Sequence, residues 1–179
     1  GHIEALAQSI ERWWWKQGRG EKLLLSFHGI PQRYVSAGDP YFDQCQTTAR
    51  LLRARLGLDE SQLIVSFQSR VGREAWLQPY TDATVQRLAK EGVKRLDVAC
   101  PGFAVDCLET LEEIAMQNRD FFIRAGGEDL RYIPALNDSP EQLSSLANLV
   151  LKHTQGWLRP THAASAQHDV ARALRDQAD

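Results

Sequence analysis

The sequence has few of the features that define several large classes of protein. Its 179 residues include only three cysteines, Cys45, Cys100 and Cys107. Three are too few for a disulfide framework, and no pair has the CxxC spacing of a zinc or iron–sulfur site, so we expect reduced thiols and no iron–sulfur cluster. The formal net charge is −2. Because no basic cluster offsets that charge, nucleic acid is not an expected partner.

Long apolar runs are missing as well. Nowhere do about 18 apolar residues follow one another, and no charged start leads into an apolar core and a small-residue cleavage site. Neither a membrane-spanning helix nor a secretory signal is visible, so we expect a cytoplasmic location, with peripheral membrane contact left open. The 43% hydrophobic and 25% charged residues are typical of an ordinary globular domain, long enough to bury about 70% of its extended-chain surface.

Short apolar runs alternate with amphipathic stretches along the chain, which predicts strands separated by single helices. The expected strands are residues 23–27, 63–67, 95–100 and 130–133. The expected helices begin near Ile3 and then cover residues 41–56, 79–90, 108–124 and 140–153. Such an order implies right-handed βαβ units. The predicted fold class is therefore α/β, a doubly wound, mostly parallel four-stranded sheet with helices on both faces, in a domain of residues 1–157 followed by a helical or disordered tail of residues 158–179.

Chemically active side chains follow the predicted strands. In an open parallel sheet, ligands bind in the crevice beyond the carboxyl ends of the strands. His28 ends the first strand, and Asp106 and Glu109 follow the third. Imidazole with carboxylate suits a borderline divalent metal such as iron, zinc or cobalt, and the same pair could act as acid and base. On this evidence alone, a structural histidine and a solvated acidic helix face are equally open.

Two of the acids lie four residues apart. On a helix, Glu109, Glu113 and Gln117 would share one face in steps of about 6 Å. Such a row could carry protons or cations from a pocket. The uncharged Gln117 would end it.

Five segments, in order, resemble the carboxyl-terminal half of the ferrochelatase family. They are residues 24–31 (LLSFHGIP), 67–72 (FQSRVG), 76–82 (WLQPYTD), 100–114 (CPGFAVDCLETLEEI) and 132–137 (YIPALN). The resemblance extends over about residues 1–151. It implies an enzyme of haem biosynthesis, a lyase that inserts ferrous iron into a porphyrin between two similar α/β halves. Porphyrin and ferrous iron are then the partners, with iron as a substrate and no permanently bound cofactor.

The resemblance also implies roles for individual residues. His28 and Glu109 match the catalytic pair that handles the metal. Glu113 matches a second step of an acidic ladder, and Asp106 matches a carboxylate at its start. The remaining two matches, to the wall of the porphyrin pocket, are Trp76 and Phe103.

Three features depart from the family pattern. Many members have a histidine where this chain has Cys107, and Gln117 replaces the third acid of the ladder. Members also carry an amino-terminal half that forms much of the pocket. The sequence therefore predicts either a piece of a longer protein or a chain that obtains its other half from elsewhere.

Three other interpretations stay open. A half-sized chelatase of the sirohydrochlorin type would assemble two copies of one domain around a tetrapyrrole. A non-catalytic flavodoxin-like module would bind a nucleotide or flavin, but it needs a Gly-rich or Ser/Thr-rich phosphate loop after the first strand, and residues 28–33 offer one glycine. An inactive piece that keeps only the fold is the third.

Overall fold

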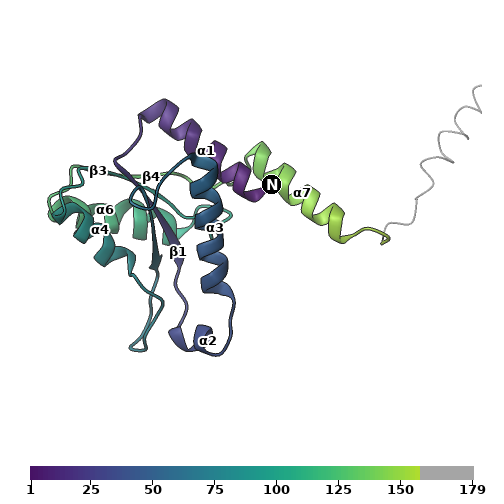
Figure 1. Cartoon of the computed structure of the whole chain (residues 1–179), viewed down its shortest axis with the longest axis horizontal. Helices are drawn as coiled ribbons and strands as arrows, with labels where there is room; N and C mark the ends of the chain where they lie inside the picture. Colours follow the sequence, from purple (N-terminus) through teal and green to yellow (C-terminus); the bar gives the residue numbers. More distant parts are fainter. Residues whose placement is uncertain (158–179) are drawn as a thin grey trace, which may run out of the picture.

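The computed structural model describes residues 1–157, and its centre is a four-stranded parallel sheet (Figure 1). The strands are β1 (Lys22–His28), β2 (Leu63–Gln68), β3 (Arg95–Ala99) and β4 (Asp129–Tyr132), in the order β2-β1-β3-β4. The expected α/β class and parallel sheet are confirmed. The predicted tail, residues 158–179, lies outside the described residues.

Helices cover both faces of the sheet. Helices α1 (His2–Gln17) and α3 (Tyr41–Leu56) pack on one face, and α4 (Thr81–Lys90) and α6 (Arg119–Arg124) pack on the other. The short helices α2 (Gln32–Ser36) and α5 (Leu108–Leu111) lie in the connections, and α7 (Pro140–His153) follows the last strand. The sequence had not indicated α2, whose five residues are too few for a recognisable apolar period.

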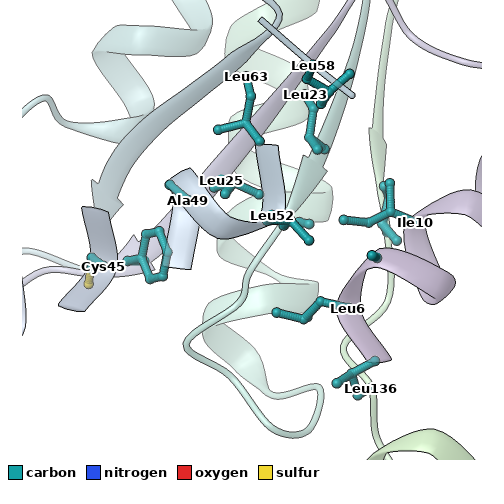
Figure 2. Close-up of a cluster of buried hydrophobic side chains, with 14 of the residues drawn as sticks. Leu6, Ile10, Leu23, Leu25, Cys45, Ala49, Leu52, Leu58, Leu63 and Leu136 are labelled. Atoms are coloured by element: carbon teal, nitrogen blue, oxygen red, sulfur yellow. The ribbon is translucent and has the colours of Figure 1, made fainter. Parts of the chain in front are cut away.

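The central strand β1 is apolar throughout because both of its faces are buried. Leu23 and Leu25 point into the cluster formed with α1 and α3, where Figure 2 shows them facing Ile10 and Leu52. Leu24 points the other way, into the cluster formed with α4 and α6. The alternation of side chains along one strand thus supplies both halves of the core.

A wholly buried carboxylate lies in the middle of β3. Asp97 pairs in register with Arg131 of β4, whose Nη2 is 2.6 Å from its Oδ1. Its other oxygen accepts hydrogen bonds from Trp14 Nε1 and the Gly20 amide, both at 2.8 Å. The end of α1 is therefore fastened to the sheet through one charge. Of the three consecutive tryptophans, Trp15 is 85% exposed, as expected for one indole off the core stripe.

The helix predicted over residues 108–124 is not continuous, and that prediction is wrong in its middle. Between α5 and α6 lies a π-helical segment, η1 (Glu113–Asn118). Asn118 Nδ2 donates to the Glu113 carbonyl at 2.8 Å, and the Glu113 side chain is held from another loop. These tertiary contacts favour the wider turn, and π-helical turns often occur at functional sites.

Helix α7 begins where the sequence predicted. Ser139 Oγ accepts from the Gln142 amide, and Pro140 occupies the first turn, which are both helix-start signals. An ion pair joins Glu141 to Arg12 of α1. Beyond that contact α7 leaves the body of the domain (Figure 1). Among residues 1–157, no helix combines the length and apolar character needed to cross a membrane.

Candidate functional site

The carboxyl ends of β1, β2 and β3 meet at one edge of the sheet. The chain moves outward from β1 to β2 and then returns to β3 on the other side of β1. Such a reversal opens a crevice at the strand ends, where α/β proteins bind ligands. His28 and Gln68 are register partners at this edge, and Glu109 follows β3.

The His28 ring has a defined orientation. Its Nδ1 lies 2.6 Å from the Gly29 carbonyl. A carbonyl can only accept, so Nδ1 carries the proton in the neutral ring and Nε2 presents a free lone pair. Tyr41 donates its hydroxyl proton to the His28 carbonyl at 2.8 Å. The backbone and the ring are thus both held, and Nε2 is the nitrogen available for chemistry.

Aromatic side chains flank this imidazole. The ring centroid of His28 is 6.5 Å from that of Trp76 and 6.1 Å from that of Phe103. Trp76 is fixed in turn, because its Nε1 donates to the Val71 carbonyl at 2.9 Å. The two residues predicted to line the pocket therefore do lie beside the predicted catalytic histidine. Together they offer apolar surface to a flat ligand.

Glu109 is half-buried near the start of α5. The neighbouring Cys107 thiol lowers the pKa of the Glu109 carboxyl, and the charge of His28 contributes in the same direction. Glu109 is therefore ionised at neutral pH, within electrostatic reach of the imidazole. Burial raises the pKa of Cys107, as does Glu109, so its sulfur stays a neutral thiol rather than the thiolate that metals prefer.

Glu113 lies at a pocket of about 240 Å³ that Gln117 also lines. Its carboxylate accepts from the Ser69 amide at 2.8 Å and from the Ser69 hydroxyl at 2.5 Å. Gln117 instead donates to Glu112 at 2.7 Å. The four-residue spacing thus does place Glu113 and Gln117 at one pocket. The role of Glu113 as a second step stays a prediction, since its oxygens already have donors.

Asp106 binds the loop that follows β4. It accepts hydrogen bonds from Tyr132 Oη at 2.6 Å, Asn137 Nδ2 at 2.8 Å, the Ala135 amide at 3.1 Å and Thr110 Oγ1 at 3.2 Å. Burial raises the pKa of Asp106, but hydrogen bonds led by that from Asn137 outweigh burial and lower it. Asp106 therefore ties the 132–137 motif to the start of α5. Its place in a ladder stays a prediction.

Within residues 1–157, no group of three or more His, Cys, Asp and Glu side chains could together hold a metal ion. His28 and Glu109 thus provide two ligands between them. Sequence reasoning missed Gln68, the strand-end glutamine that contacts this region. A polar residue at the end of an apolar strand was the only signal.

Fold and site together define an open parallel α/β domain with an imidazole–carboxylate pair and aromatic walls at its switch point. A family model for ferrochelatase matches residues 1–154. Ferrochelatases of Nitrosococcus oceani and Thioalkalivibrio sulfidiphilus are 60% and 54% identical over 157 and 180 residues, covering 88% and 99% of this chain. The chain belongs to the ferrochelatase family.

The matched relatives are longer than this chain. The aligned part is 43% of the Nitrosococcus protein and 49% of the Thioalkalivibrio protein, so the chain spans about half the length of the curated relatives it matches. A solved structure of a cobalamin (vitamin B12) biosynthesis CbiX protein from Marinobacter aquaeolei has a TM-score of 0.48 and 15% identity, covering 75% of this chain and 97% of that one. That likeness is too weak to carry an argument.

Proposed function

We propose that this chain is the metal-handling half of an enzyme that inserts ferrous iron into a porphyrin in haem biosynthesis. The observation that carries the proposal is His28, with Nε2 free, set between Trp76 and Phe103 and electrostatically coupled to the ionised Glu109. Membership of the ferrochelatase family supports the same reaction. Iron acts as a substrate, and no cofactor is permanently bound. Metal analysis of the purified protein should find no stoichiometric metal.

The reaction requires two pyrrole protons to leave and one dication to enter. Nε2 of His28 is placed to accept a proton, because its partner nitrogen already donates to Gly29. Glu109 carries the negative charge that attracts the ion and stabilises it while it loses water. Imidazole and carboxylate are both acceptable ligands for ferrous iron.

The macrocycle must also bend so that its nitrogen lone pairs become accessible. Such ground-state strain is supplied by binding contacts away from the reacting atoms. Trp76 and Phe103 would contribute apolar contact close to His28. One domain provides one wall, so we expect the rest of the contact from the other half of the enzyme.

We propose that the apolar face of α7 packs against this second half. Leu143, Leu146 and Val150 follow helical spacing and are 55%, 45% and 58% exposed. α7 extends beyond the domain (Figure 1), and the relatives contain about as much additional chain as is present here. An amino-terminal half of that size is the occupant we assign to this face.

The double substitution Leu143→Lys and Val150→Lys should weaken binding of the amino-terminal half of the Nitrosococcus relative at least about tenfold, measured by calorimetry. Burying each apolar side chain contributes about 1.5–3 kcal/mol, and the substitutions remove two. Lys152→Glu serves as the control for a charge change on α7. Unchanged affinity would contradict the assignment. So would a stable dimer of this chain alone by light scattering, which would favour the half-sized chelatase.

We also propose a cytoplasmic location with peripheral membrane contact. Val71 and Leu108, which follow β2 and β3, are 72% and 77% exposed, and such apolar surface near the site suits a lipid interface. The protein should sediment with phosphatidylglycerol vesicles, and Val71→Ser with Leu108→Ser should lower the bound fraction at least about threefold. Equal sedimentation of both proteins would contradict this contact.

The function itself is tested by anaerobic porphyrin metallation with ferrous iron, using protein that carries this chain together with the amino-terminal half. We expect catalytic turnover. Porphyrin binding without metallation would favour a binding module or an inactive piece instead.

A further inference from the structure

Gln68 contacts the backbone that carries His28. It is the last residue of β2, only 3% exposed, and the register partner of His28. Its carbonyl accepts from the Gly29 amide at 2.7 Å. A Cβ on Gly29 would lie 2.9 Å from that carbonyl oxygen and 3.2 Å from Trp76, so glycine is needed for this close approach. The position of His28 is therefore set directly against Gln68.

The side chain of Gln68 contacts the backbone that carries Glu109. Its Nε2 donates to the Glu109 carbonyl at 2.6 Å, and its Oε1 accepts from Ser26 Oγ at 2.7 Å. The carbonyl of Glu109 can only accept, so the orientation of the amide is fixed by its partners. Nε2 also lies 3.4 Å from Ser69 Oγ and from Glu113 Oε2. One amide therefore joins the end of β2 to the start of the acidic helix.

Buried hydroxyls hold this amide from behind. Ser26 Oγ lies 2.8 Å from Thr81 Oγ1, which lies 2.9 Å from Ser66 Oγ. All three residues are at most 1% exposed. Polar groups this deep are retained only when satisfied, and a satisfied network has little freedom to move. The Gln68 side chain is accordingly kept in one position.

We infer that Gln68 is a positioning residue that sets where Glu109 stands relative to His28, through its carbonyl on Gly29 and its amide on Glu109. The inference rests on the proposed function for its kinetic consequence. His28 and Glu109 belong to different elements, β1 and α5, so their separation depends on a residue that touches both. Misplacement of a reacting group by about 1 Å can cost about 100-fold in rate.

The test substitutes Gln68→Met, which keeps the volume and removes the amide. In the protein with both halves, kcat should fall by about 10- to 100-fold while KM for porphyrin changes less than about threefold. Gln86→Met is the matched control, because Gln86 Nε2 also donates to a backbone carbonyl, that of Asp82 at 3.0 Å. A wild-type kcat in folded Q68M protein would overturn the inference.

A second variant separates positioning from general support. The ionised carboxylate of Q68E can accept from Ser26 but cannot donate to Glu109, whereas its protonated form can. The ratio of Q68E to wild-type kcat should therefore rise as pH falls, and a pH-independent ratio would contradict the inference. Should the wild type not metallate porphyrin, the proposed function fails separately. The crystal structure of Q68M, or of Q68E if Q68M does not fold, then decides, with the Glu109 carbonyl displaced if Gln68 positions it and unmoved if not.

Discussion

Replacing either His28 or Glu109 with alanine should abolish porphyrin metallation while leaving the protein folded. We expect kcat to fall by about 10²- to 10⁴-fold in each variant, the usual contribution of a positioned acid or base. His28→Ala removes the free Nε2 acceptor, and Glu109→Ala removes the ionised carboxylate beside it. The double variant should lose little more than either single one, since residues that act as a unit are not additive.

Folding should survive both substitutions because neither side chain belongs to the buried core. His28 and Glu109 are each half-buried at the rim. Glu112→Gln is the matched control, an acid three residues from Glu109 whose oxygen accepts from Gln117. Its kcat should stay within about twofold of wild type, as is usual for a surface substitution away from a site. Wild-type turnover in folded H28A or E109A protein would remove that residue from the mechanism.

Asp97→Ala should be the most damaging single change for stability. It leaves the nearly buried guanidinium of Arg131, 11% exposed, without its counter-charge, and it deprives Trp14 and Gly20 of their acceptor. Breaking a buried pair from one side costs about 3–5 kcal/mol. The urea midpoint should fall accordingly at an unchanged m value.

The control for this change is Glu128→Ala. Glu128 lies 3.6 Å from Lys94 but is 71% exposed, so its removal should cost less than about 1 kcal/mol. A loss below about 1 kcal/mol for Asp97→Ala as well would show that the buried pair does not hold α1 to the sheet.

Local signals in the sequence were sufficient to predict most of the fold. The runs that became β1 and β2 are apolar because both faces are covered, and Ser139 with Pro140 marks the start of α7 in one turn of chain. The positions of His28 and of the Glu109 segment followed from topology, since parallel strands end at one edge.

Features that depend on distant partners could not be predicted in this way. The π-helical turn at Glu113 depends on Ser69, which lies 44 residues away. The amide of Gln68 and the Glu109 carbonyl are 41 residues apart, and only the strand register and the packing of α5 bring them together. Asp97 carried a faint signal, because a carboxylate inside an apolar strand requires a buried positive partner.

The most direct test of the central claim is an anaerobic spectrophotometric assay of porphyrin metallation with ferrous iron. It uses catalytic amounts of protein in which this chain is joined to its amino-terminal half. The account predicts many turnovers per protein, lost in E109A and retained in E112Q. Porphyrin binding with no metalloporphyrin formed, or equal turnover in E109A and E112Q, would contradict it.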